Sequence, residues 1–142
     1  MAYDNENIFA KILRGEIPSE KLYEDTDTFV FMDIMPRADG HCLVIPKTNC
    51  RNMFDASLEQ LSACLKTVQL VSHAVMQAFD AQGVTVQQFN EAAGGQEVFH
   101  LHYHVLPRHE GVGLRPPGKM CDFGVLKQHA DMIRAVLSNP GS

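Results

Sequence analysis

The chain has 142 residues, of which 45% are hydrophobic and 20% are charged, and its formal net charge is −5. These values are typical of a globular domain, and the negative charge argues against general attraction to the backbone of nucleic acids. The sequence has no apolar run near the roughly 18 residues of a membrane span, and its first residues lack the order of a signal peptide. Four widely spaced cysteines without a Cys-x-x-Cys pair favour reduced thiols over a disulfide framework. We therefore expect a cytoplasmic protein without nucleic-acid or membrane partners.

The first 46 residues predict a short helix followed by three strands. Apolar residues recur at helical spacing over residues 5–15, where Asp4 or Asn5 can cap the helix and Gly15 can end it. The first two strands are expected to form a hairpin around an acidic turn, and a turn cluster with Pro and Gly precedes the third. The three strands are expected over residues 21–24, 28–33 and 41–45.

The following segment predicts a long helix and a second hairpin. Ser57 begins the helix, with Gln60 as its capping-box partner, and an apolar stripe continues to about residue 80. A strand over residues 84–90 is expected to pair with the strand that follows residue 95. Beyond this hairpin we expect a loop, a closing helix and a frayed tail, over residues 110–119, 125–137 and 138–142.

The most informative segment is His100-Leu101-His102-Tyr103-His104, in which three histidines alternate with apolar residues. Successive side chains of a strand point to opposite faces, so the three imidazoles are expected to line one face. The apolar residues Phe99, Leu101, Tyr103 and Val105 are then expected on the other. A single histidine is commonly a hydrogen-bonded residue at the edge of a core. Three in strict alternation suit neither an apolar core nor an ordinary solvated face, and they predict a functional row of imidazoles.

The chemistry of this row follows from the pKa of histidine, which is about 6.5 when unperturbed. Neighbouring rings on one face are roughly 6.6 Å apart at Cα. Like-charge repulsion at that spacing disfavours protonation of all three, so at least one ring is expected to stay neutral and nucleophilic. The central ring, His102, is flanked on both sides, and a backbone carbonyl can fix its other nitrogen. It is the predicted nucleophile.

The segment His-Leu-His-Tyr-His-Val-Leu resembles the signature of the histidine triad family. Four further pieces resemble the nucleotide-binding, adenosine phosphoramidase-like branch of that family and occur in the family's order. They lie within residues 8–18, 31–36, 40–47 and 90–96. The resemblance thus spans most of residues 8–108.

This resemblance implies an α+β fold with a five-stranded, mainly antiparallel sheet and two or three helices. It implies a single domain over residues 1–142, with a core at about 8–108 and a C-terminal extension at about 109–142. It also implies a homodimer. The long helix is a plausible contact, although the core of a monomer would explain its apolar stripe as well.

In the family, the middle histidine attacks the α-phosphate of a nucleotide, and water then cleaves the nucleotidyl-histidine. The resemblance assigns this role to His102, assigns orientation and phosphate binding to His100 and His104, and makes His41 the fourth histidine. The implied nucleotide-binding residues are Asp33 for the ribose, Ile34 and Phe9 for the base, and Asn90, Gln96, Glu97 and Val98 for the phosphate or leaving group. The implied substrate is a purine nucleotide, an AMP or GMP conjugate such as a phosphoramidate, and no cofactor or metal is implied.

Two departures from that branch concern the substrate. Glu97 stands where the branch usually has a serine, and Pro107-Arg108 resembles the branch that hydrolyses dinucleoside polyphosphates. Hydrolysis of dinucleoside polyphosphates is therefore one alternative, and a nucleotide-binding regulatory protein with incidental turnover is another.

A zinc site is a third alternative. His41, His100 and His102 could hold Zn²⁺ with one position open. The family order argues against it, and so does the strand geometry, which puts the outer histidines, His100 and His104, roughly 13 Å apart at Cα.

Overall fold

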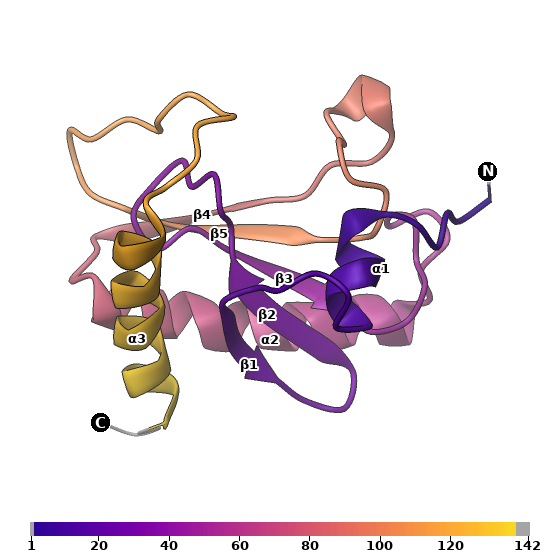
Figure 1. Cartoon of the computed structure of the whole chain (residues 1–142), viewed down its shortest axis with the longest axis horizontal. Coiled ribbons are helices and arrows are strands. Elements are labelled where there is room, and N and C mark those ends of the chain that lie inside the picture. The colour runs from indigo at the N-terminus through magenta and orange to yellow at the C-terminus, as the bar shows by residue number, and fades with distance from the viewer. Residues whose placement is uncertain (1, 139–142) are drawn as a thin grey trace.

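Five short strands form one antiparallel sheet in the order β1-β2-β3-β5-β4 (Figure 1). The computed structural model describes residues 2–138. The strands are β1 (Lys21–Glu24), β2 (Thr28–Met32), β3 (Cys42–Pro46), β4 (Gly83–Gln87) and β5 (Tyr103–Arg108). The helices are α1 (Ile8–Leu13), α2 (Leu58–Ala78), α3 (Phe123–Ser138) and a 3₁₀ turn, η1 (Ala92–Gly94). The α+β prediction is confirmed, and every strand pair is antiparallel.

Alternation along β2 and β3 gives the sheet two apolar faces. Val30 and Val44 belong to the larger core, which α2 and α3 cover, whereas Phe31 and Leu43 pack with Phe9 of α1 on the other face (Figure 1). Both faces of these central strands are buried, so their side chains are apolar in both directions. The α1 face is the one that bears the cavity described below.

The predicted helix cap is confirmed at α2 and is wrong at α1. The Gln60 N–H donates to Ser57 Oγ at 3.1 Å, and the Ser57 N–H donates to Gln60 Oε1 at 2.7 Å, which confirms the predicted capping box. At α1 the prediction of Asp4 or Asn5 is wrong, because Asn7 accepts the Ala10 N–H at 2.9 Å. Asn7 has extended backbone angles and stands three residues before its donor, as an N-cap requires.

The strand predicted through the histidines begins only at Tyr103, so His100 and His102 precede β5. The reason lies in β3, which pairs with β5 as far as Val44 opposite Tyr103 and ends at Pro46. Proline has no N–H with which to continue a ladder. The Leu101 N–H donates instead to the carbonyl of Cys50 at 2.8 Å. The segment before β5 is thus held without strand pairing, and β4 correspondingly ends at Gln87, three residues earlier than predicted.

The chain after β5 loops beyond the end of the sheet, beside the segment between β2 and β3, before it forms α3 (Figure 1). The Arg115 N–H donates to the carbonyl of Arg37 at 2.8 Å, and the Cys121 N–H donates to that of Ile34 at 2.9 Å. The loop over residues 110–119 was predicted, and the closing helix extends slightly beyond its predicted bounds. Ser138 ends α3, and the rest of the predicted tail lies outside the described residues.

No helix within residues 2–138 combines the length and the apolar character needed to cross a membrane.

Candidate functional site

A cavity of about 370 Å³ opens on the α1 face of the sheet. His41, His102 and His104 line it together with the carboxylate of Asp33. Most of the remaining lining is apolar, and the other predicted site residues that line it are Phe9, Ile34, Glu97 and Val98. A concave, largely apolar site with a few convergent polar groups is the usual form of a small-molecule site.

The predicted alternation holds over residues 101–105, even though His102 precedes the strand. It does not extend to Phe99, which was predicted with the core residues and instead lies under the guanidinium of Arg51. Leu101, Tyr103 and Val105 lie in the core under α2 and α3. The rings of His102 and His104 lie on the opposite side, with their centroids 5.0 Å apart. An extended backbone alternates its side chains whether or not its N–H groups are paired in a sheet.

His100 differs from the other two, because its ring is fully buried and does not line the cavity. One ring nitrogen, Nε2, lies 2.8 Å from the carbonyl oxygen of Pro46, and a carbonyl can only accept, so Nε2 carries the proton. Nδ1 is then the acceptor for the Tyr3 hydroxyl at 2.5 Å. Both nitrogens are occupied, so the ring of His100 positions the backbone of the segment and does not reach the cavity.

The tautomer of His102 is fixed in the same way. Its Nδ1 lies 2.7 Å from the carbonyl oxygen of His100, so Nδ1 carries the proton and Nε2 has the free lone pair. The sequence had suggested that a backbone carbonyl could hold the second nitrogen in this way. The ring of Phe9 meets the His102 ring edge-on, with centroids 4.9 Å apart. His102 therefore presents a nucleophilic nitrogen in a fixed orientation.

His41 and His104 form a second fixed pair. The Arg37 N–H donates to His41 Nδ1 at 3.0 Å, which leaves the His41 proton on Nε2. His41 Nε2 lies 2.9 Å from His104 Nδ1 and 3.5 Å from Asp33 Oδ2. His104 Nδ1 therefore accepts, and its Nε2–H remains as a donor for a ligand in the cavity.

The turn before His41 depends on Gly40. This residue has a φ of +87°, and a Cβ there would lie 2.5 Å from a ring carbon of Phe79. A side chain at position 40 is thus excluded both by the backbone conformation and by the close approach to Phe79. The turn cluster predicted over residues 36–40 is present and delivers His41 to the site.

Burial lowers the pKa of all four imidazoles. It brings the pKa of His41 and of His100 to about 4 and that of His104 to about 3, and it lowers the pKa of His102 as well. The neighbouring positive charges of Arg37 and Arg115 lower the pKa of His41 further. All four rings are therefore neutral at pH 7, which extends the prediction that at least one would be.

Asp33 has two roles in the structure. Its Oδ1 accepts the Met35 N–H at 2.8 Å, as a residue that ends a strand commonly does. The side chain also lines the cavity, and its Oδ2 faces His41. A carboxylate oxygen is thus available to a ligand beside the histidines.

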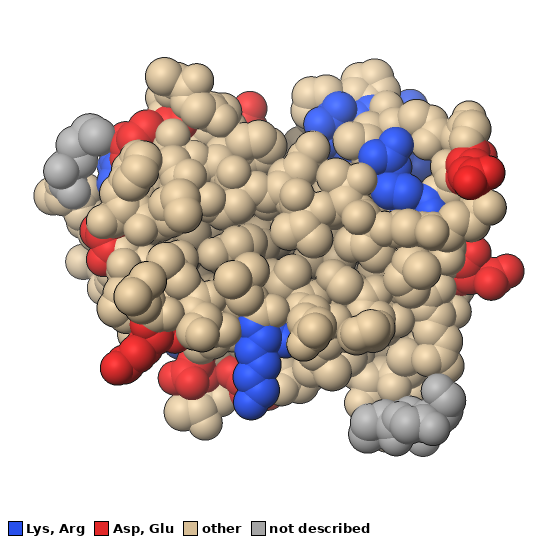
Figure 2. All heavy atoms as spheres, turned by 180° about the vertical axis from the view of Figure 1, so that it is seen from behind, with Lys and Arg blue, Asp and Glu red and all other residues tan. Residues whose placement is uncertain are grey.

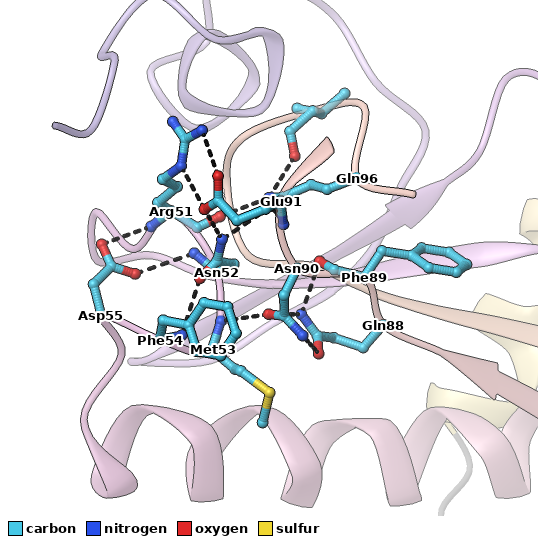
Figure 3. A network of polar contacts seen from close by, with 11 residues as sticks. Arg51, Asn52, Met53, Phe54, Asp55, Gln88, Phe89, Asn90, Glu91 and Gln96 are labelled. Carbon is cyan, nitrogen blue, oxygen red and sulfur yellow. Dashed lines mark hydrogen bonds and ion pairs between the residues drawn. The ribbon is translucent and has the colours of Figure 1, made fainter. Parts of the chain in front are cut away.

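Asn90 and Gln96 lie outside the cavity lining and belong to a polar network (Figure 3). Asn90 Oδ1 accepts the Met53 N–H at 2.9 Å. The Gln96 amide donates to the carbonyls of Arg51 and Val98 at 2.7 and 3.0 Å, and Gln96 Oε1 accepts the Glu91 N–H at 2.8 Å. These side chains hold the loop before β5 in place, and that loop carries Glu97 and Val98 to the cavity edge.

The metal-ligand set weighed from the sequence, His41 with His100 and His102, is not assembled, because both nitrogens of His100 are occupied. Within residues 2–138, the group whose donor atoms lie within 4.8 Å of one another is Asp33, His41 and His104. An ion there would need a lone pair on His41 Nε2. The Arg37 N–H keeps the proton on that nitrogen, so these residues are set as a hydrogen-bond chain and fit a metal ion poorly.

Comparisons with known proteins agree with this geometry. A match to the HIT domain family covers residues 14–111. Adenosine 5'-monophosphoramidase HNT1 of Candida albicans is 32% identical over 145 residues, which cover 97% of this chain and 95% of that protein. Adenylylsulfatase HINT3 of Arabidopsis thaliana is 37% identical over 106 residues, which cover 75% of this chain and 54% of that protein.

Solved structures give the same result. The crystal structure of a Hit-like protein from Bartonella henselae, which is involved in cell-cycle regulation and holds an unknown ligand, is 53% identical in sequence. Its TM-score is 0.91, and the match covers 95% of this chain and 98% of that chain.

Proposed function

This chain belongs to the HIT family, in its HINT-like branch, and we propose that it is a hydrolase or nucleotidyl transferase acting on the α-phosphate of purine nucleotide conjugates. The preferred class is a purine nucleoside 5'-phosphoramidate or a related conjugate, and the product is a nucleoside monophosphate. One observation carries the proposal: His102 lines the cavity with its Nδ1–H held by the His100 carbonyl and its Nε2 lone pair free.

Binding would use the residues at the cavity wall. The Asp33 carboxylate is an acceptor that suits the two ribose hydroxyls, and the apolar side chains of Phe9 and Ile34 suit the flat base. The Nε2–H of His104 would donate to an oxygen of the α-phosphate. A donor fixed in advance favours the charge that develops on phosphate oxygens during the reaction.

The reaction then takes two steps. In the first, the Nε2 lone pair of His102 forms a bond to the α-phosphorus. The bond from phosphorus to the leaving group breaks with its electron pair on that group, which takes up a proton from solvent water. In the second, a water oxygen attacks the same phosphorus, the phosphorus–nitrogen bond breaks, its electron pair returns to Nε2, and the water proton is released. Between the steps the His102 ring carries positive charge, which the His100 carbonyl would stabilise through Nδ1–H.

The test follows AMP release from adenosine 5'-phosphoramidate by the wild type and by His102→Ala. We expect the substitution to lower turnover by at least about 1,000-fold, because the covalent route is lost. His73→Ala is the matched control, since His73 is exposed on α2 away from the cavity. Mass spectrometry of the quenched reaction should find a nucleotidyl adduct on His102.

Three outcomes would count against the proposal. Unchanged turnover in His102→Ala would remove the proposed nucleophile, and loss of activity with EDTA would favour a metal-dependent reaction. Slow wild-type turnover at saturating substrate, together with tight AMP binding, would favour a regulatory nucleotide-binding role.

We also propose that residues 1–142 form one HIT domain, since Leu126, Ala130 and Ile133 of α3 pack into the same core as α2. The homodimer and the cytoplasmic location expected from the sequence stay predictions. For the dimer, α2 offers Leu58 and Leu65, which are 83% and 53% exposed. Sedimentation of the wild type and of Leu65→Lys would test that contact.

A further inference from the structure

Arg37 is an arginine at the cavity wall without a carboxylate partner among residues 2–138. Its Nε–H donates to the carbonyl of Arg115 at 2.8 Å, which fixes the direction of the side chain. The two terminal nitrogens have no acceptor within the described part of the chain. A guanidinium presents its donors as a planar fork that matches the oxygens of a phosphate or sulfate.

The loop after β5 holds the Arg37 side chain in place and leaves it without a carboxylate partner. Arg115 donates its backbone N–H to the Arg37 carbonyl at 2.8 Å and its side-chain Nε–H to the Pro36 carbonyl at 3.3 Å. Arg115 also forms the ion pair with Asp39, at 2.9 Å. The carboxylate closest in sequence to Arg37 is thus used by Arg115, and Arg37 keeps its charge for another group.

Figure 2, which views the molecule from behind and thus from the side away from α1, shows Lys and Arg side chains gathered at the upper right, where the loop at the upper left of Figure 1 lies. At the site, burial is the main cause of the low pKa of His41 and of His104, and the charge of Arg37 lowers both pKa values further. A guanidinium that acts on both rings lies within range of an anion bound between them.

We propose that Arg37 binds a second anionic group of the substrate, a phosphate or sulfate beyond the α-phosphate. This inference rests on the proposed function and adds to it a preference, among the related conjugates, for nucleotides that carry such a group. The group can come from two sources: it is part of the leaving group, as in a nucleoside 5'-phosphosulfate or a polyphosphate, or it is attached to the ribose. Arg37 is then a specificity residue, and the loop over residues 110–119 positions it.

The kinetic test compares adenosine 5'-phosphosulfate, which has an anionic leaving group, with adenosine 5'-phosphoramidate, which does not. Arg37→Gln should lower kcat/KM for the phosphosulfate by about 10- to 100-fold, the usual cost of a charge-assisted hydrogen bond. The loss of kcat/KM for the phosphoramidate should be at least about tenfold smaller than the loss for the phosphosulfate. Lys66→Gln, an exposed site on α2, is the control for net charge. Equal losses with both substrates, or no loss with either, would overturn the proposal for the leaving group.

The binding test separates the two sources by calorimetry with AMP, ADP and adenosine 3',5'-bisphosphate. If the leaving group supplies the anion, Arg37→Gln should weaken ADP binding at least tenfold more than AMP binding. If the ribose supplies it, the bisphosphate should show that excess loss. Equal effects on all three ligands would overturn the proposal.

The binding test also separates this inference from the proposed function. If the wild type releases no AMP from either substrate, the hydrolase proposal fails, yet the binding comparison still decides the role of Arg37. Arg37→Lys, which keeps the charge but loses the fork, should recover part of the affinity. That partial recovery would distinguish loss of an anion contact from collapse of the loop.

Discussion

Two pairs of loops flank the cavity, and they differ in whether all their arginines have a carboxylate partner. The first pair, which we call the clamp, joins the loop after β3 to the loop before β5 through Arg51, Asn52, Glu91 and Gln96 (Figure 3). Arg51 binds Glu91 with two hydrogen bonds of 2.8 and 2.9 Å, and its guanidinium lies 4.2 Å from the ring centroid of Phe99. The second pair, residues 33–41 with residues 109–122, uses Arg115 and Asp39 for its ion pair and leaves Arg37 unpaired.

Side chains that hold the site have partners within the protein, whereas side chains that are available to a ligand do not. In the clamp, the four named side chains form hydrogen bonds with one another or with nearby backbone groups. Glu91 adopts a φ of +67°, an uncommon conformation held by the hydrogen bonds that its side chain accepts from Arg51 and Asn52 and that its N–H donates to Gln96. The clamp therefore has little left to offer a substrate, whereas the second pair presents a free guanidinium.

A fall in pH should destabilise the protein through the buried histidines and leave the clamp intact. This is the largest effect that we expect. The buried histidines that line or support the cavity are His41, His100 and His104, and their pKa values in the folded protein are about 4, 4 and 3. The clamp depends on Glu91, whose pKa is lowered by Arg51. Between pH 6.5 and about pH 4, the unfolded chain therefore binds protons at histidines that stay neutral in the folded protein.

The sign follows from linkage. Stability is fully present above pH 6.5 and falls as the pH drops toward 4, by about 1.4 kcal/mol per pH unit for each histidine. Urea unfolding at pH 8, 7, 6 and 5 should show a plateau above pH 7 and a steep loss below 6.5. His73→Ala, at an exposed site, should leave the slope unchanged. A flat profile down to pH 5 would contradict the neutral, buried histidines.

The second prediction breaks the clamp at Gln96, which is 4% exposed. Gln96→Leu removes the donors to the Arg51 and Val98 carbonyls and the acceptor for the Glu91 N–H. Leaving such groups unpaired should cost about 2–4 kcal/mol of unfolding free energy, measured in urea. Gln128→Leu, at an exposed position of α3, is the control and should change stability by less than about 0.5 kcal/mol. An equally small effect at Gln96 would mean that the clamp does not hold the loop.

Much of the frame follows from local sequence. Strand β1 has its predicted bounds, and the capping box at Ser57 and Gln60 begins α2 as expected, because both signals depend on residues a few positions apart. The alternation from Leu101 to Val105 likewise assigns each side chain to its face. Local signals were thus sufficient for the bounds of β1, the start of the long helix and the faces of residues 101–105.

Contacts between distant segments were not predictable in this way. Arg51 and Glu91 are 40 residues apart, and neither belongs to a pattern that would pair them. Position 46 did offer a signal, since a proline that ends a strand also ends the ladder of its neighbour. That signal explains why His100 turns to the Pro46 carbonyl and leaves the cavity. The unpaired state of Arg37 depends on Arg115, 78 residues away, and could be seen only in the fold.

The smallest effect is expected at Glu97, a charged residue at the cavity edge on the loop that the clamp holds. Glu97 is exposed and lines the cavity, and no ion pair involving it occurs within residues 2–138. If Arg37 binds an anion, Glu97 opposes the same anion through solvent, where charges act weakly and salt screens them. Glu97→Gln should therefore raise kcat/KM for adenosine 5'-phosphosulfate by only about two- to threefold. The gain should shrink at high salt and be absent with the phosphoramidate.

Glu59→Gln, at an exposed site in the first turn of α2, removes the same charge elsewhere and is the matched control. A loss of activity in Glu97→Gln with both substrates would show that this carboxylate contacts the substrate, and the assignment of a free charge to each side of the cavity would then be wrong. A gain that persists at high salt would place Glu97 closer to the bound anion than its exposure suggests. The expected pattern, a small and salt-sensitive gain confined to the anionic substrate, requires a positive group on the other side of the cavity. Arg37 meets that requirement, because it is a cavity-lining cation without a carboxylate partner in the described part of the chain.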